Sequence, residues 1–443
     1  MLFDLKVLLS LVSTLSLASK AIADCSYVGG NYYCAQTDAV VYENLGFSGS
    51  YSDVTNMDET SCQCSQQSLS FSGTMSPLDE ELSVHFRGPL SLAQFGVYYP
   101  AGSSQKKKKV KRDDTTGCDT TQAVHHVHKR AAAVEIVEAT ATVYEDLQGS
   151  TIYPSGVSSA APAAPAASSA SSAAAPASQA SSAPAASSSS SSSGAGAGAG
   201  DWVRSSYYAP GTGDNLVFLN HQGGTAGSGT WSSCFGNSLS YCASDGQSGA
   251  GSAQVLDSVT IASDVEYLIM SGNQCGASSP SGDCGYYREG TPAFHGFSGA
   301  DKIFVFEFQM PSDTSGSTYN QDMPAIWLLN AKIPRTLQYG DATCSCWSTG
   351  CGELDLFEIL SSGSDKLISH LHDGQGGNGA QGGGGSQDYF DRPTDSTMKA
   401  AAVFTGGDVY IVELDDSTDF SDSLSSGTVN SWISTSASVA QIA

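Results

Sequence analysis

One stretch of the chain, residues 154–200, consists almost wholly of Ser, Ala, Pro and Gly and carries no charged residue. Such a composition cannot bury enough apolar surface to build a core, so we expect a disordered linker here. Dense Ser with Pro is typical of an O-glycosylated stalk. The linker predicts three further parts: a small, Cys-containing, β-rich N-terminal domain at 24–112, a connecting segment at 113–153 and a large C-terminal domain at 201–443.

The first 23 residues have the features of a secretory signal peptide. An apolar stretch from Val7 to Ala18 precedes Ala21-Ile22-Ala23, and it is too short to predict a transmembrane helix. We therefore expect an extracellular protein without a membrane partner. Two basic sites, ending in Lys111-Arg112 and Lys129-Arg130, are either processing sites or solvated loops. Three histidines lie between them, and in a polar segment they are more often incidental than metal ligands: His125, His126 and His128.

The chain has twelve cysteines, which fit the oxidising compartment that secretion implies. Five precede the linker and seven follow it, so either one disulfide joins the two halves or two thiols stay free. Cys344, Cys346 and Cys351 could form a metal site, but disulfides are the commoner use of such cysteines in a secreted chain. We predict no metal and no cofactor.

The formal net charge of −25 disfavours nucleic acid and anionic membranes as partners. A neutral polysaccharide fits such a surface better. We expect a monomer that works in a polysaccharide matrix outside the cell.

Strand patterns dominate residues 201–443. Residues 302–310 alternate strictly, with three phenylalanines and Met310 on one face. Further strands are expected at 325–329 and 366–372, and a hairpin around Gly406-Gly407 joins two more. Because no long segment has a helical period, the sequence predicts an all-β sandwich.

A short acidic run places Glu353, Asp355 and Glu358 among apolar residues in one of these strands. Burying carboxylates costs free energy unless they are paired or used. Glu353 and Asp355 share a face, and a β-bulge at Leu356-Phe357 would return Glu358 to it. The two glutamates would then approach to about 5–5.5 Å, the separation in a retaining glycosidase. A surface strand and a metal-binding strand are the alternatives, and the apolar neighbours Leu354, Leu356 and Phe357 disfavour the surface strand.

The acidic run resembles the Glu-x-Asp-x-x-Glu signature of the laminarinase-like glycoside hydrolases of family 16. Residues 323–329 are similar to that family's Pro-Ala-Phe/Ile-Trp strand, and Trp347 is similar to its Trp before Gly-Glu. The resemblance implies a concave β-jelly roll. It also implies that Glu353 is the nucleophile, that Glu358 is the general acid and then the base, and that Asp355 tunes their protonation.

The layout of the whole chain resembles the fungal cell-wall proteins of the "target of SBF" family, which carry a Ser/Ala-rich linker and a β-1,3-glucanase-like domain. The likeness includes the glycine tract at 374–385 and covers about 25–102 and 215–414. It implies a secreted endo-β-1,3-glucanase acting on β-1,3-glucan in the cell wall. A transglycosylase with the same carboxylates is the first alternative. A non-catalytic wall-binding glycoprotein is the second, and the intact acidic run argues against it.

Sugar rings bind on flat apolar platforms, which aromatic side chains provide. Trp327 and Trp347 are the candidate platforms, although Trp327 equally fits core packing. His372, on the expected neighbouring strand, is a candidate substrate contact. His370, two residues earlier, would face the same side of that strand. Three residues beyond the glycine tract are expected to border the cleft: Tyr389, Phe390 and Arg392.

Overall fold

The computed structural model describes residues 25–28, 31–103, 200–376 and 382–442, and the backbone of two short strands between residues 104 and 199. The chain divides into two compact units, one of residues 1–109 with 195–443 and one of residues 110–194. In the second unit, β8 (Tyr144–Glu145) pairs with β9 (Thr151–Ile152). The expected signal peptide, basic sites, histidine group and all but the end of the linker lie outside the described residues.

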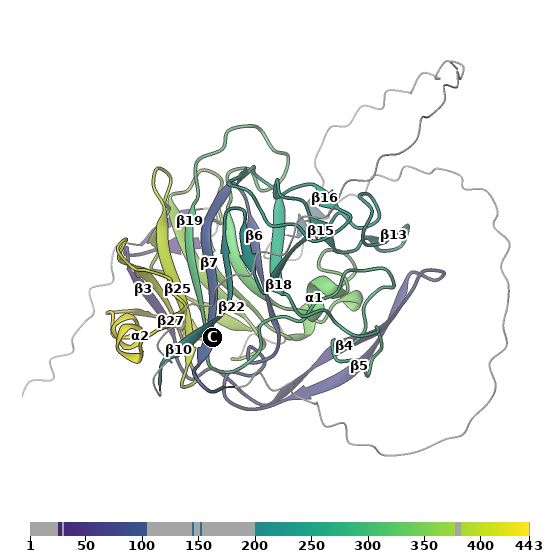
Figure 1. Cartoon of the computed structure of the whole chain (residues 1–443), viewed down its shortest axis with the longest axis horizontal. Helices are drawn as coiled ribbons and strands as arrows, with labels where there is room; N and C mark the ends of the chain where they lie inside the picture. Colours follow the sequence, from purple (N-terminus) through teal and green to yellow (C-terminus); the bar gives the residue numbers. More distant parts are fainter. Residues whose placement is uncertain are drawn as a thin grey trace, which may run out of the picture. The chain divides into compact units, whose positions relative to one another are not determined.

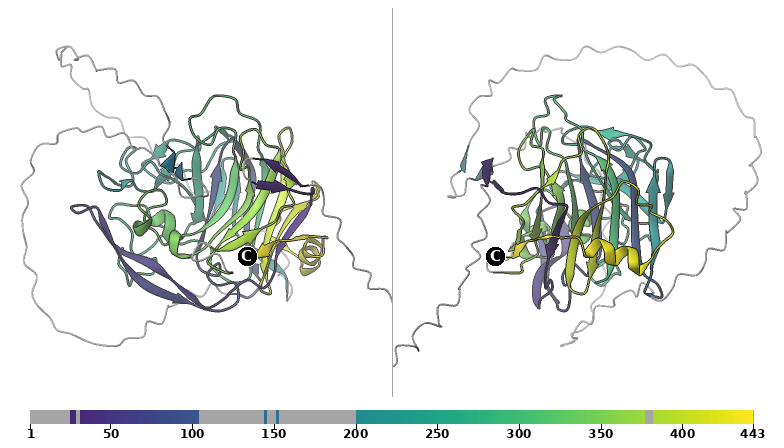
Figure 2. Two further views of the ribbon diagram at one scale, coloured as in Figure 1. Left: turned by 180° about the vertical axis from the view of Figure 1, so that it is seen from behind. Right: turned by 90° about the vertical axis from the view of Figure 1, so that its left-hand side faces the viewer.

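The first unit is built mainly from β-strands, which form two large sheets packed face to face (Figures 1 and 2). The ten-stranded sheet contains, in spatial order, β11 (Thr212–Asp214), β10 (Trp202–Ala209), β7 (Leu90–Pro100), β19 (Lys302–Gln309), β25 (Met398–Thr405), β26 (Asp408–Leu414), β3 (Ala39–Tyr42) and β28 (Ser438–Val439), with β17 (Thr260–Ile261) beside β7 and β27 (Ser423–Leu424) beside β10. The eleven-stranded sheet contains β16 (Gly249–Ala250), β15 (Ser240–Cys242), β12 (Leu216–Asn220), β18 (Glu266–Ser271), β6 (Leu82–Arg87), β20 (Ala325–Asn330), β21 (Glu353–Glu358), β22 (Lys366–His372), β23 (Gly383–Gly385) and β29 (Gln441–Ile442), with β24 (Phe390–Asp391) beside β22.

Smaller elements surround the two sheets. Three two-stranded pairs are β1 (Ser26–Val28) with β2 (Asn31–Tyr33), β4 (Gly49–Asp58) with β5 (Gln63–Phe71), and β13 (Trp231–Ser232) with β14 (Gly236–Asn237). The described helices are short: α1 (Lys332–Arg335), α2 (Ser426–Ile433), and the 3-10 helices η1 (Ala342–Cys344) and η2 (Trp347–Thr349). None of the described helices is long and apolar enough to cross a membrane.

An aromatic core joins the two sheets. Phe86 of β6 lies edge-on to Phe95 of β7, with ring centroids 6.4 Å apart, and Phe308 of β19 packs against Phe357 of β21 at 5.3 Å. All four side chains are fully buried. Burial of this apolar surface, at about 25 cal/mol per Å², is the main force that holds the sheets together. The all-β prediction is confirmed, as are the strands expected at 302–310, 325–329 and 366–372 and the late hairpin.

Three strands that precede the linker occupy interior places in the two sheets. β6 pairs with β18 and β20, and β7 pairs with β10 and β19. β3 lies between β26 and β28. The described parts of 24–112 and 201–443, which the sequence analysis separates into two domains, therefore form one compact unit. An alternating pattern shows that a segment is a strand, but it does not show which distant strand supplies its hydrogen bonds.

The β4–β5 hairpin extends beyond the sheets and pairs only with itself (Figure 1). It is covalently fixed, because Cys62 bonds to Cys234 and Cys64 bonds to Cys344. Two disulfides therefore join the halves of the chain, where the odd cysteine counts suggest one or none. The other described disulfides join cysteines that are close in sequence: Cys25–Cys34, Cys275–Cys284 and Cys346–Cys351. Among the described residues, Cys242 is a free and buried thiol.

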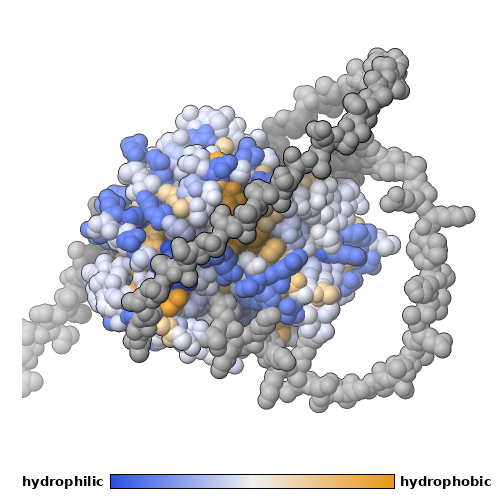
Figure 3. All heavy atoms as spheres, viewed as in Figure 1, coloured by the Kyte–Doolittle hydropathy of each residue, from blue (hydrophilic) through white to orange (hydrophobic). Residues whose placement is uncertain are grey.

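The molecular face in Figure 3 carries mainly hydrophilic and neutral residues, with small hydrophobic areas between them. One set of apolar side chains from both sheets points into the shared core, and apolar side chains on the outer faces are buried in smaller clusters of their own.

The interior position of β6 and β7 predicts how the chain responds to a cut in the linker. A protease site inserted within residues 154–200 should, after cleavage, leave one band on a non-reducing gel and two bands on a reducing gel, because two disulfides cross the cut. The near-ultraviolet circular dichroism should stay unchanged, since the described contacts between the halves remain. Halves that separate without reductant would contradict the two disulfides, and a changed circular dichroism spectrum would contradict the shared sheets.

Candidate active site

The acidic run forms β21, between β20 and β22 in the eleven-stranded sheet. The pairing with β20 passes from Phe357 to Asp355 while β20 advances by a single residue, so Leu356 is an extra residue. The pairing with β22 shifts at the same point. The β-bulge expected at Leu356-Phe357 is confirmed. Both bulge residues and Leu354 are fully buried in the core between the sheets, which leaves the three carboxylates on the opposite face.

The register of the sheet defines the neighbours of each carboxylate on that face. In the middle row Asp355 lies between Trp327 of β20 and His370 of β22. Ala325 of β20 pairs with Glu358 on one side and with Arg87 of β6 on the other, so these three residues form one cross-strand row. Glu353 pairs with His372. The structure therefore brings together all six residues that the sequence predicts for the site, since Trp347 also contacts Glu353.

Each glutamate has its own hydrogen-bond donor. The indole Nε1–H of Trp347 donates to Glu353 Oε2. Arg87 Nη2 donates to Glu358 Oε1 at 3.2 Å. Asp355, in the middle, has His372 Nε2 at 3.5 Å from its Oδ2. The donors on Glu353 and Glu358 favour the charged forms of these two carboxylates.

Burial and mutual repulsion oppose full ionisation of the group. Burial, together with the charge of Asp355, raises the pKa of Glu353 to about 8. Burial and the charge of Glu358 raise the pKa of Asp355 well above its usual range. Burial lowers the pKa of His370 to about 4, and the neighbouring His372 adds to this, so the His370 ring is neutral at physiological pH. Glu353 and Asp355 therefore retain protons around neutral pH, so the site holds a proton of the kind that general acid catalysis uses.

The two tryptophans occupy different positions. Trp327 is only 5 % exposed, stacks on His85 at a centroid distance of 5.1 Å, and has the Arg87 guanidinium 5.7 Å from its ring centroid. Trp347 lies in η2 and is partly exposed, with its ring centroid 6.3 Å from that of His372. Trp347 is thus the ring that the site can offer to a ligand, whereas Trp327 packs beneath Arg87.

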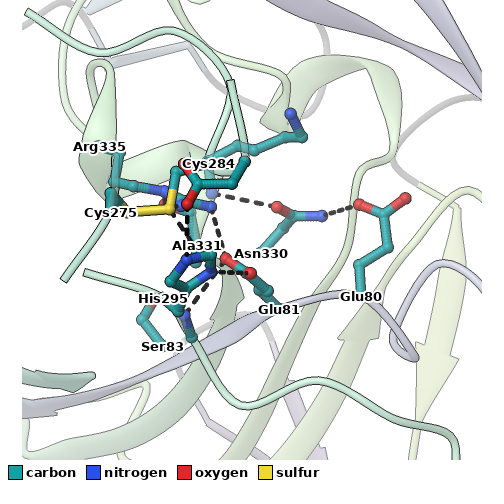
Figure 4. A network of polar contacts seen from close by, with 12 residues as sticks. Glu80, Glu81, Ser83, Cys275, Cys284, His295, Asn330, Ala331 and Arg335 are labelled. Carbon is teal, nitrogen blue, oxygen red and sulfur yellow. Dashed lines mark hydrogen bonds and ion pairs between the residues drawn. A yellow bond between two sulfur atoms is a disulfide. The ribbon is translucent and has the colours of Figure 1, made fainter. Parts of the chain in front are cut away.

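The start of β21 is fixed by a polar network behind it (Figure 4). Asn330, the last residue of β20, donates through Nδ2 to Glu80 Oε2 at 2.9 Å and to the Cys351 carbonyl at 3.0 Å. Its backbone N–H donates to the Gly352 carbonyl at 2.9 Å. Close by, Glu81 accepts from His295 Nδ1 and pairs with Arg335 at 3.1 Å (Figure 4). The Asn330 bonds hold Cys351 and Gly352, the two residues directly before Glu353.

The loop that carries Trp347 is held by the β4–β5 hairpin. The Cys64–Cys344 and Cys346–Cys351 disulfides flank this tryptophan. The backbone N–H of Ser52 in β4 donates to Thr349 Oγ1 at 2.9 Å. The segment before the linker therefore positions an aromatic ring at the site.

The sequence analysis did not identify Arg87, His85 or Glu266 as site residues. His85 Nδ1 lies 3.0 Å from Glu266 Oε1, and Gln338 and Tyr339 also donate to Glu266. Burial opposes the charge of Glu266, but the hydrogen bond and charge of His85 lower its pKa to about 2. Arg87 and His85 lie on β6, which pairs with β20, and Glu266 lies on β18, the next strand beyond β6. These places follow only from the sheet order. No local pattern in the sequence indicates that order.

The expectation for Phe390 and Arg392 is wrong. Phe390 is fully buried in the core, and Arg392 is 6 % exposed and paired with Asp322 at 2.5 Å. β24 pairs with β22 through Leu367 and Phe390, and the Phe390 side chain belongs to the core between the sheets. Tyr389 instead stands near Lys366, whose Nζ lies 4.7 Å from its ring centroid.

Two groups of potential metal ligands occur among the described residues. Cys275, Cys284 and His295 form one, but its two cysteines are joined in a disulfide and offer no thiolate. The other consists of Asp355, Glu358 and His370, whose ligand atoms lie within 4.8 Å of one another. The guanidinium of Arg87 on Glu358 disfavours a cation there.

Models of one known protein family match the parts of this unit before and after the linker. Residues 200–432 match the C-terminal model of the cell wall protein YJL171C/Tos1 family, and residues 38–100 match its N-terminal model. The chain belongs to this family of cell wall proteins. Members named probable circularly permuted 1,3-beta-glucanase TOS1, from Saccharomyces cerevisiae and Candida albicans, are each 56 % identical to it and cover 96 % of the chain. The alignments span 96 % and 97 % of these relatives.

A more distant member of the family, a probable circularly permuted 1,3-beta-glucanase of Schizosaccharomyces pombe, is 42 % identical over 94 % of the chain and 95 % of its own length. No solved structure matches the chain.

The raised pKa of Glu353 predicts a pH-dependent stability. Between the usual value of 4.5 and about 8, the folded protein holds a proton that the unfolded chain has released. Stability from this group is therefore lost as the pH rises through that window. We expect Glu353→Gln to raise the free energy of unfolding by ~1–3 kcal/mol at about pH 8 and to have little effect below about pH 4.5.

Urea unfolding of both proteins across this pH range measures the difference. Glu307→Gln is the control variant, because Glu307 lies on β19 of the other sheet, apart from the three carboxylates of β21. Equal stability of the Glu353→Gln variant and the unaltered protein at about pH 8 would contradict the cost assigned to the buried carboxylates.

Proposed function

We propose that the protein is a retaining endo-β-1,3-glucanase of the cell wall, with Glu353 and Glu358 as its catalytic pair. The observation that carries the proposal is the bulge in β21, which puts three carboxylates on one face with separate donors on the two glutamates. Paired carboxylates are what retaining glycoside hydrolysis requires. The names of the relatives supply the substrate class, β-1,3-glucan.

In the first step Glu353 attacks the anomeric carbon, and a covalent glycosyl-enzyme forms as the bond to the leaving sugar oxygen breaks. The Trp347 N–H bond favours the charged, nucleophilic form of Glu353 and opposes the burial that raises the pKa of this carboxylate. Glu358 gives its proton to the leaving oxygen. Asp355, between the two glutamates, can hold that proton, because burial and the charge of Glu358 raise its pKa well above the usual range.

In the second step Glu358 takes a proton from water, and the water oxygen displaces Glu353 from the sugar. Arg87, 3.2 Å from Glu358, stabilises the carboxylate that Glu358 becomes after the first step. In the free protein the same contact favours the charged form of Glu358. This electrostatic preference, taken alone, fits the opposite assignment of the two glutamates, and the labelling experiment below distinguishes the two.

For substrate binding, we assign the partly exposed ring of Trp347 as a sugar platform and His372, whose side chain is 38 % exposed, as a polar contact. Trp327 supports the site from below through Arg87 and His85. This assignment needs no metal and no cofactor.

We further propose that the two sheets are a circularly permuted β-jelly roll. The interior places of β3, β6 and β7 support this reading, since strands from before the linker complete sheets made mostly after it. The names of the relatives state the same permutation for them. We also propose secretion, a glycosylated linker and action as a monomer in the wall matrix, which rest on the sequence features.

The function is tested by incubating the secreted protein with laminarin and sizing the products. We expect shorter glucans with the anomeric configuration retained, and a loss of about a thousandfold or more in kcat for Glu353→Gln and for Glu358→Gln. A 2-fluoro-glucoside trap followed by peptide mass spectrometry should label Glu353.

A label on Glu358 would reverse the two catalytic roles. Products longer than the donor would indicate transglycosylation by the same carboxylates. No turnover of any β-glucan by the correctly folded protein would reject the enzyme and leave a wall-binding role. Glu307→Gln again serves as the control and should retain full activity, since Glu307 lies on the other sheet.

Trp347 has two separable roles in this proposal. Trp347→Phe keeps an aromatic ring but removes the N–H bond to Glu353, so kcat should fall about tenfold with little change in KM, and the pH profile should shift upward. Trp347→Ala should in addition raise KM. Steady-state kinetics on laminarin separate these effects, with Trp231→Phe, an exposed residue of β13, as control. An unchanged pH profile for Trp347→Phe would exclude the role of its N–H group.

A further inference from the structure

A small hollow lies beside the catalytic carboxylates and has no role in the proposed mechanism. Its volume is about 230 Å³, and it lies between β22, β23 and the N-terminal hairpin β1–β2. Side chains that can hydrogen-bond to a sugar line it, together with one aromatic ring: Asn31, Tyr32, His370, Ser386 and Gln387. Pockets for whole drug-sized ligands have about 300–1,000 Å³, so this hollow suits one ring of a longer ligand.

The hollow is continuous with the site. His370, which lines it, is the register partner of Asp355, and its ligand atom lies within 4.8 Å of those of Asp355 and Glu358. Ile368, also in the lining, is the register partner of Glu358. A glucan lying over the carboxylates and running across the strands would therefore reach the hollow directly.

The floor of the hollow depends on a strand without side chains. β23 consists of three glycines, and Gly385 faces His370 across the ladder. A Cβ atom on Gly385 would lie 2.6 Å from Cδ2 of His370, closer than such atoms can approach. Glycine here leaves the His370 ring its place and keeps the hollow open.

The rim carries exposed aromatic surface. Tyr32 is 52 % exposed and Tyr27 is 60 % exposed, and their ring centroids are 4.8 Å apart. Their neighbour Tyr33, on the opposite side of β2, is buried. An exposed pair of aromatic rings beside a polar hollow matches a sugar ring, which has an apolar face and a polar edge.

The hairpin is held firmly against the sheet. The Cys25–Cys34 disulfide closes it, the Cys34 backbone N–H donates to the Gln387 carbonyl at 2.8 Å, and the Ala35 N–H donates to Asp388 Oδ1 at 2.9 Å. The left view of Figure 2 shows its two dark purple strands. A rim fixed in this way can bind without a large entropic cost of ordering.

We propose that the β1–β2 hairpin forms a glucosyl-binding subsite of the cleft, in which Tyr32 stacks on a sugar ring and Asn31, His370 and Gln387 contact its hydroxyl groups. The inference rests on the proposed function, because the occupant is one unit of the β-1,3-glucan that Glu353 and Glu358 cleave. The N-terminal hairpin then sets how firmly the enzyme holds the end of the glucan that extends past β22.

The test measures binding without turnover. Calorimetry with laminarihexaose on the full-length Glu353→Gln protein gives the reference affinity. Adding Tyr32→Ala should weaken binding about tenfold, whereas Tyr32→Phe should retain it. Asn31→Ala, which keeps the Tyr27–Tyr32 pair, should weaken binding severalfold. Tyr207→Ala, a tyrosine of β10 on the other sheet, is the matched control and should change affinity less than about twofold.

Circular dichroism of each variant checks the fold. If both Tyr32→Ala and Asn31→Ala bind laminarihexaose like the reference while the unaltered protein cleaves laminarin, the subsite is wrong and the proposed function stands. If the unaltered protein cleaves no glucan and the Glu353→Gln protein binds none, the proposed function is wrong and the subsite falls with it.

Discussion

The antiparallel pairing of β6 with β18 on one side and β20 on the other is the interaction on which the rest of the structure depends. A strand in the middle of a sheet must have both of its hydrogen-bonding edges satisfied, and removing it would leave two buried edges without partners. The same strand delivers Phe86 to the core between the sheets and Arg87 to the carboxylates on the other face. Stability and the electrostatics of the site therefore come from one short segment that lies far from the acidic run in the sequence.

The site shows how the fold tolerates three acids on one buried strand. Each glutamate has a donor from a different part of the chain, Trp347 from the loop before β21 and Arg87 from β6. Asp355 between them has a raised pKa, so the group avoids three full charges. The remaining repulsion among the carboxylates lowers the stability of the fold, as is common at catalytic sites. The Cys64–Cys344 disulfide of the Trp347 loop, the Asn330 hydrogen bonds and the packing of the two sheets offset this cost.

The sequence was informative where the signal is local. The alternation of Phe304, Phe306 and Phe308 predicted β19 and its inward face, and the spacing of Glu353, Asp355 and Glu358 predicted the bulge. It failed where partners are distant. The linker suggested two domains because a break in composition says nothing about strand pairing across it. Arg87 escaped notice for the same reason, since its link to Glu358 exists only once β6 lies beside β20. The prediction that Phe390 borders the cleft was wrong because the polar residues around it in the sequence give no sign that it pairs with β22.

The interior location of β6 also governs the order in which the protein can be made. β6 emerges from the ribosome long before β18 and β20 exist, so its two edges cannot be satisfied until nearly all of the chain has been synthesised. Contacts between such distant segments give a high contact order, which is associated with slow folding. The early strands must pass this interval without their partners. Folding of this unit is therefore a late event, completed after translation and closed by the Cys62–Cys234 and Cys64–Cys344 bonds.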